Sequence, residues 1–177
     1  MIVALLNRKS DVGKMALALD PVGGWAHQRL RVAVIDADRK GDNENCWLDW
    51  SEQRVKDGLT RLFRVLGLVF GAPRRKALEI ACTVDHVVTD GPPRFAVQTR
   101  SALLATDVAL TPFQPSPSGE GAPVEIRKLL EKAPIFRPDI HPRFILNRYG
   151  PRALMVAEML RDPRANFLEA HGAGSDG

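Results

Sequence analysis

Residues 2–16 read IVALLNRKSDVGKMA, and the rest of the chain is best interpreted from this stretch outward. The apolar run Ile2–Leu6 has the length and composition of a buried strand. A short polar turn follows, and Gly13-Lys14 opens a segment of helix-forming residues. The first turn of a helix presents unpaired N–H groups and a positive dipole end, and the lysine adds a charge. The arrangement therefore predicts a turn that binds a phosphate chain.

Further along the chain, apolar runs alternate with segments of helical spacing. The strand-like runs after the first are Arg31–Asp36, Leu62–Leu66, Val84–Asp90, Asp107–Thr111 and Arg143–Asn147. The segments with helical spacing are Lys14–Gln28, Pro73–Cys82, Arg94–Ala105, Val124–Lys132 and Pro151–Arg161. Strands that are apolar throughout and separated by helices indicate a parallel sheet covered on both faces. We therefore expect an α/β fold with a three-layer, doubly wound, mostly parallel sheet.

Two local expectations concern the first helix and the end of the chain. Pro21 falls inside the first helix and Gly23-Gly24 follow, which predicts a kink or an early break near Asp20. Trp25 would then pack the second half against the sheet. Residues 1–165 are expected to form the domain and residues 166–177 a frayed tail. No strand is expected after the last helix, so the sheet would lack a final strand.

Bulk composition limits the class of protein. The chain has 177 residues, 45% of them hydrophobic and 26% charged, which is ordinary for one soluble globular domain. No apolar run approaches the ~20 residues that span a bilayer, and no secretory signal is visible. Cys46 and Cys82 fit no metal-binding spacing. We therefore expect a cytoplasmic protein in which both are plain thiols.

The net charge of +4 is concentrated in the second half of the chain. Between Pro123 and Arg164, nine Lys and Arg residues stand against five Asp and Glu residues. Such an excess could face a nucleic acid or could be an ordinary solvated surface, and the sequence leaves both open.

Carboxylates follow two of the predicted strands. Asp36 and Asp38 leave the second strand on the same side, where they could handle a metal or a water molecule or could cap a turn. The fourth strand ends in Asp90, the Walker B arrangement that holds Mg²⁺ through water. Gly91 follows and is expected to leave its N–H free near a terminal phosphate.

Three more residues draw attention. Trp47 and Trp50 are interpreted as local packing or as an exposed interface pair. Asn147, after the sixth strand, has the donors and the acceptor that read an adenine edge, although a turn role is equally open.

With these motifs in order, the chain resembles the ParA/MinD family of deviant Walker A P-loop ATPases, and most of all ParA-type partition proteins. The resemblance runs from Met1 to about Arg161. The family's Walker A turn reads Lys-Gly-Gly-Val-Gly-Lys-Thr-Thr, which Lys9, Val12 and Gly13-Lys14 match. Two later stretches resemble switch I and the Walker B and switch II segment, respectively residues 34–38 with Gly41 and residues 90–93.

The resemblance implies ATP and Mg²⁺ as cofactors and a role for each matched residue. Lys14 would bind the β- and γ-phosphates, and Lys9 would reach across a dimer to the partner's nucleotide. Asp38 would position the attacking water, Asp90 would hold Mg²⁺ through water, and Asn147 would contact the adenine. The other residues implied to lie against the nucleotide are those of the turn and of switch II, namely Ser10, Asp11, Val12, Gly13, Met15, Ala16 and Gly91.

The partners that the resemblance implies are a second copy of the chain, DNA and a protein. The family forms nucleotide-dependent homodimers that bind DNA without sequence specificity and act with a DNA-bound ParB-like protein. No membrane partner is expected.

The Walker A turn departs from the family at the positions where its chemistry is least tolerant. Ser10 and Asp11 stand where the family has glycine. At an effective dielectric of 20, two like charges ~4 Å apart repel by ~4 kcal/mol, so Asp11 opposes a polyphosphate. Met15 replaces a threonine whose hydroxyl binds Mg²⁺, and a thioether is a poor ligand for a hard cation. Ala16 removes a second hydroxyl.

Three functions therefore stay open at this point. The chain could be a ParA-like ATPase of DNA partition whose hydrolysis is weakened by Ser10, Asp11 and Met15. It could be a catalytically dead nucleotide-binding scaffold. It could also be a DNA-binding accessory whose basic second half works without ATP.

Overall fold

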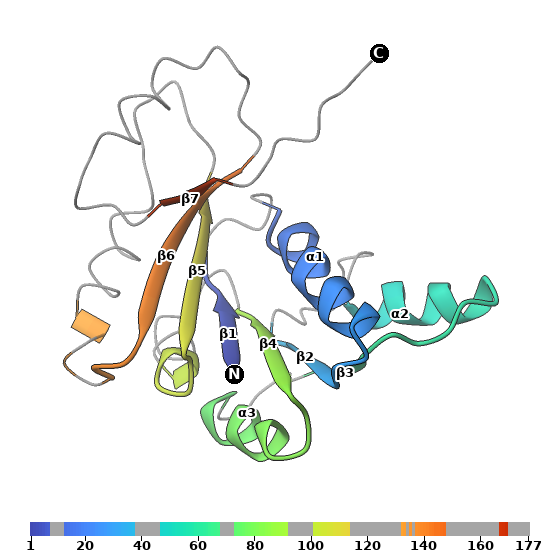
Figure 1. Ribbon diagram of the computed structural model, residues 1–177, viewed down its shortest axis with the longest axis horizontal. Helices are drawn as coiled ribbons and strands as arrows, with labels where there is room; N and C mark the ends of the chain where they lie inside the picture. Colours follow the sequence, from blue (N-terminus) through green and yellow to red (C-terminus); the bar gives the residue numbers. More distant parts are fainter. Residues whose placement is uncertain are drawn as a thin grey trace, which may run out of the picture.

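The strands of the computed structural model form one seven-stranded sheet with the order β3-β2-β4-β1-β5-β6-β7 (Figure 1). The described parts of the chain are residues 1–7, 13–37, 47–67, 73–91, 101–113, 132–133, 135, 137–147 and 167–169. The strands are β1 (Ile2–Leu5), β2 (Val32–Asp36), β3 (Arg64–Gly67), β4 (His86–Asp90), β5 (Val108–Phe113), β6 (His141–Leu146) and β7 (Phe167–Glu169). Every pairing recorded between these strands is parallel. The predicted α/β fold and its first six strands are confirmed.

Helices pack on both faces of the sheet. The helices α1 (Lys14–His27) and α2 (Trp47–Lys56) lie next to each other in Figure 1, and α3 (Pro73–Ala81) lies apart from them. One apolar cluster joins α1 and α2 to alternate residues of the central strands, among them Leu5, Val34 and Val88. A second cluster joins α3 to the intervening residues, including Ala33 and Val87. No helix in the described ranges is long and apolar enough to span a bilayer.

The helix α1 does not break at Pro21, so that prediction is wrong. The helix runs without interruption from Lys14 to His27 and contains Pro21. An interior proline costs a helix about 3 kcal/mol, because it removes one backbone hydrogen bond and crowds the preceding turn. Ala18 and Val22 are fully buried against the sheet on either side of it, and this packing offsets the local cost. Trp25 packs against the same cluster, as predicted.

The structure extends the predicted elements in two places. The helix α2 was not predicted from the sequence. The expectation of no strand after the last helix is also wrong, because Phe167–Glu169 pairs in parallel with Phe144–Leu146. The predicted tail therefore contains a short edge strand. Of the predicted helices, Pro151–Arg161 lies outside the described residues, as do Val124–Lys132 apart from Lys132 itself and residues 94–100 of Arg94–Ala105.

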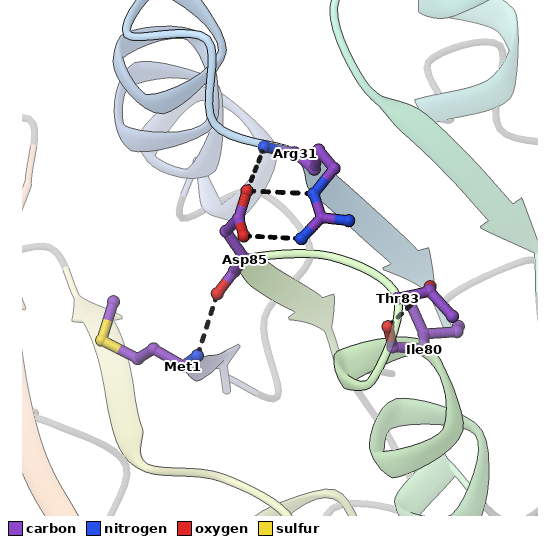
Figure 2. Close-up of polar contacts among 5 residues, drawn as sticks. All are labelled: Met1, Arg31, Ile80, Thr83 and Asp85. Carbon is purple, nitrogen blue, oxygen red and sulfur yellow. Dashed lines mark hydrogen bonds and ion pairs between the residues drawn. The ribbon is translucent and has the colours of Figure 1, made fainter.

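Carboxylates fasten the edge of the sheet at which the strands begin. Asp85 precedes β4 and accepts the backbone N–H of Arg31 at 2.8 Å, while the Arg31 guanidinium lies 2.9 Å from its other oxygen (Figure 2). The N-terminal ammonium of Met1 donates to the Asp85 carbonyl at 3.1 Å. Asp107, before β5, accepts the Ile2 N–H at 2.7 Å and pairs with Arg137 at 3.0 Å. These contacts set the register of the central strands from their first residues.

The Arg31–Asp85 contact predicts an acid-sensitive contribution to stability. Hydrogen bonds from Arg31 lower the pKa of Asp85 from 3.8 to about 2. Since the pKa is lowered by folding, the contribution is complete above pH 3.8 and is lost as the pH falls toward 2. We expect the unfolding free energy of the wild type to fall more between these pH values than that of Asp85→Asn. Urea denaturation at a series of pH values measures this, with Asp57→Asn in the turn after α2 as the matched control. Equal slopes for wild type and Asp85→Asn would contradict it.

Candidate functional site

The edge of the sheet at which the strands end carries a helix start with the geometry of an anion site. Gly13 caps α1 with φ 80° and ψ 30°, a left-handed conformation that glycine adopts without steric cost. Lys14, the first residue of α1, is 3% exposed. The first turn of α1 carries no acidic residue, and Gly13 has no side chain that could cap the helix. The amides and the positive end of this helix are thus suited to a phosphate.

Two buried carboxylates lie on neighbouring strands at the same edge. Asp36 ends β2 and Asp90 ends β4, and the two are register partners in a parallel pair. They are 3% and 6% exposed. Because side chains alternate along a strand, Asp36 lies on the face of Val34 and Asp90 on the face of Val88, which α1 and α2 cover. Both carboxylates therefore lie on the face of the sheet that is covered by α1, the helix that begins at Lys14.

The carboxylate of Asp90 has a partner that the sequence did not suggest. The indole Nε1–H of Trp47 donates to Asp90 Oδ2 at 3.0 Å, and the contact is buried. Trp47 is the first residue of α2 and is 1% exposed. The interpretation of Trp47 as packing is right, since its ring contacts Phe63, but incomplete. A buried tryptophan needs a partner for its N–H, and a nearby strand-end carboxylate was the signal that could have identified one.

The prediction that Gly91 leaves its N–H free is wrong. This N–H donates to the carbonyl of Leu5 at 3.0 Å and so extends the pairing of β4 with β1 beyond Asp90. A Cβ atom at Gly91 would lie 2.9 Å from Leu6 Cδ2 and 3.0 Å from the Leu5 carbonyl oxygen. Close approach of the Leu5 backbone and the Leu6 side chain is enough to favour a glycine at this position.

The remaining predicted residues fall into two groups. Met15 is half-buried and packs against the apolar cluster under α1, and Ala16 on the same turn is exposed. Asn147 directly follows β6 and is half-buried, separated from β4 in the sheet by β1 and β5. The predicted residues that lie outside the described ranges are Lys9, Ser10, Asp11, Val12 and Asp38.

The described residues fit a magnesium ion only if a ligand completes its coordination. Mg²⁺ in proteins is bound through one or two carboxylates, several waters and substrate phosphates. Asp36 and Asp90 supply the oxygen chemistry, and no group of three His, Cys, Asp or Glu residues forms a closed metal site within the described ranges. Met15 supplies no hard ligand, because its side chain packs into the core. The arrangement suits a metal that arrives with a phosphate chain.

Comparison with known proteins agrees with this geometry. The chain is 27% identical over 163 residues to maintenance of carboxysome distribution protein A from Halothiobacillus neapolitanus, covering 89% of this chain and 70% of that protein. A plasmid partition protein from Borrelia burgdorferi B31, bound to AMPPNP, superimposes with a TM-score of 0.73 at 13% identity, covering 99% of this chain and 86% of that one. The chain has the fold of the ParA/MinD-type P-loop ATPases.

A MinD structure also has the same fold as this chain. MinD from Pyrococcus horikoshii OT3, complexed with Mg-ADP, matches with a TM-score of 0.58 at 18% identity, covering 84% of this chain and 70% of that one. No protein-family model matches the chain. The resemblance to the ParA/MinD family that the sequence suggested is thus confirmed, and at these identities the structures show the shared fold.

Proposed function

We propose that this chain is a ParA-like ATP-binding protein that holds ATP and Mg²⁺ at the carboxyl edge of its sheet. One observation carries the proposal: α1 begins with the left-handed Gly13 and the buried Lys14, on the face where Asp36 and Asp90 are neighbours. The helix start suits the phosphates, and the two carboxylates suit the water shell of the metal. Mg²⁺ bound there would neutralise charge on the phosphates. Lys9 and Asp38 belong to the proposed catalytic set, with Asn147 as the proposed adenine contact.

We further propose that hydrolysis is slow because the turn is degenerate. Ser10 and Asp11 replace glycines, and Asp11 adds a negative charge beside the phosphates. Met15 directs its side chain into the apolar cluster, so the Mg²⁺ ligand that the family takes from this position is missing. We propose that, with these changes, the protein still binds the phosphates of ATP but hydrolyses ATP slowly.

Restoring the turn tests this proposal. The variant Ser10→Gly, Asp11→Gly and Met15→Thr is expected to raise Mg²⁺-dependent ATP hydrolysis at least tenfold, which corresponds to ~1.4 kcal/mol of the barrier. Phosphate release measures the rate, and titration calorimetry with ATP and ADP, each with and without Mg²⁺, measures binding. Lys14→Ala in the restored protein is the control and should abolish the gain. Rapid Mg²⁺-dependent turnover by the wild type would overturn the slow-hydrolysis proposal.

For the biological role we propose DNA partition or segregation, with a nucleotide-dependent homodimer on non-specific DNA and a DNA-bound ParB-like partner. The support is the likeness to a plasmid partition protein and the excess of cations after Pro123. One of those cations, Arg137, pairs with Asp107 within the fold and is not counted among the proposed DNA contacts. A catalytically dead scaffold is the alternative if ATP binds without turnover.

Binding to a non-specific duplex across a salt series, with and without ATP, separates these roles. Binding that requires ATP supports the dimer. Binding without ATP and with a steep salt slope supports the ATP-independent DNA accessory instead. Absence of binding at low salt would remove DNA as a partner.

A further inference from the structure

The aromatic residues at the start of α2 are held in a fixed arrangement. The rings of Trp47 and Phe63 meet edge to face, with centroids 5.8 Å apart and an interplanar angle of 76°. Trp50 stacks on the same Phe63, with centroids 5.6 Å apart and an angle of 7°. The Arg54 guanidinium lies 5.7 Å from the centroid of Trp50. Packing against Phe63 therefore holds the Trp47 ring in place independently of the hydrogen bond that its N–H makes.

That fixed ring directs its only polar atom at Asp90. The indole Nε1 is a donor and never an acceptor, and it lies 3.0 Å from Asp90 Oδ2. Trp47 is 1% exposed and Asp90 is 6% exposed, so water competes little for the contact. A hydrogen bond from a rigid donor to a buried carboxylate determines which way the carboxylate is turned.

Asp90 also bonds to the end of β2. The backbone N–H of Ala37 donates to the Asp90 carbonyl oxygen at 3.0 Å. Ala37 is followed in sequence by residues 38–46, and Trp47 comes directly after them. The last described residue before this segment and the first described residue after it therefore bond to the same residue, one to its carbonyl and one to its carboxylate.

We propose that Trp47 is a positioning residue for Asp90, and this inference rests on the proposed Mg²⁺–ATP site. With Oδ2 held toward α2, the carboxylate presents a fixed set of lone pairs to the water shell of the metal. Without the indole N–H, the carboxylate loses a contact that orients it. Partners of this kind, which touch a metal-binding group rather than the metal, typically change metal affinity by 10–100-fold when removed.

The test compares Trp47→Phe with Trp50→Phe. The first variant keeps an aromatic ring and removes the N–H that donates to Asp90, whereas the second changes a neighbouring tryptophan that stacks on Phe63. Binding of Mg²⁺ to the ATP-loaded protein is followed by titration calorimetry. We expect the half-saturating Mg²⁺ concentration to rise about tenfold in Trp47→Phe and to change less than twofold in Trp50→Phe. The ATP affinity in EDTA should stay the same in both.

A second measurement keeps Trp47 in place and follows its indole N–H by NMR. The indole ¹⁵N–¹H resonance of Trp47 is expected to shift when Mg²⁺ is added to the ATP complex, and to shift in Asp90→Asn without any ligand. This readout carries the test if Trp47→Phe fails to fold.

The outcomes separate this inference from the proposed function. If wild type binds Mg²⁺–ATP but the Mg²⁺ dependence of Trp47→Phe is unchanged, or the indole resonance does not respond, the positioning role is overturned alone. If wild type binds no ATP, the proposed function falls and this inference falls with it.

Discussion

Replacing Lys14 by methionine is expected to weaken ATP binding about 100-fold, which equals ~2.7 kcal/mol. Lys14 is the first residue of α1, next to the left-handed Gly13, and its side chain is buried at the proposed phosphate site. Hydrogen bonds between charged groups contribute ~1.5–3 kcal/mol each, so loss of the ammonium accounts for an effect of this size. Methionine preserves the length of the side chain and removes the charge.

The effect should appear in binding rather than in folding. Replacing the buried ammonium with an apolar chain removes its desolvation cost together with its contacts, so these two effects on the unfolding free energy oppose each other, whereas ATP binding loses the charge outright. Titration calorimetry measures ATP affinity, and urea denaturation measures stability. Lys56→Met, at the exposed end of α2, is the matched control and should leave ATP affinity unchanged. Unchanged affinity in Lys14→Met would place ATP elsewhere or exclude it.

The sequence predicted the fold well because its strongest signals are local. Each of the six apolar runs could form a strand without knowledge of its neighbours, and the alternation with helices then required a parallel sheet. The strand β7 was missed because it has only three residues at the sheet edge, and its pairing with β6 is a tertiary contact. Pro21 was given too much weight because the burial of Val22 overrides local propensity.

The site was less accessible to sequence reasoning because it depends on strand order. Asp36 and Asp90 were each recognised as strand-end carboxylates, but only the adjacency of β2 and β4 makes them partners. Strand order also explains why the prediction for Gly91 is wrong. Because β4 pairs with β1, the Gly91 N–H donates to the Leu5 carbonyl instead of being free. The hydrogen bond from Trp47 to Asp90 could not be predicted without knowing that α2 exists. That helix is polar along most of its length and shows no clear apolar stripe in the sequence.

Gly91→Ala is expected to lower the unfolding free energy by about 1–3 kcal/mol, the range for forcing a methyl group into packed structure. The new Cβ would meet Leu6 Cδ2 at 2.9 Å and the Leu5 carbonyl oxygen at 3.0 Å. Leu6 is 1% exposed, so its side chain has little room to move. The Leu5 oxygen is also the acceptor of the Gly91 N–H, so moving the two backbones apart would lengthen that hydrogen bond.

A second glycine provides a control, because its replacement by alanine should raise the unfolding free energy instead of lowering it. Gly24 lies inside α1, and nothing lies within 4 Å of a Cβ placed there. Gly24→Ala should therefore stabilise the protein by about 0.5–1 kcal/mol, because alanine loses less backbone freedom in a helix. Urea denaturation of both variants measures the difference. Equal stability of Gly91→Ala and wild type would show that Leu6 yields, and the close approach of β1 and β4 would then not constrain this position.

The Gly91 substitution also tests how the site depends on the sheet. Gly91 directly follows Asp90, and its N–H bonds to the carbonyl of Leu5, the last residue of β1. A backbone shift that accommodates the methyl group would move the end of β4 relative to β1, and with it Asp90 relative to the start of α1. We expect Gly91→Ala to weaken Mg²⁺ binding in the ATP complex more than ATP binding in EDTA. Equal losses in the two measurements would instead indicate general unfolding of this edge.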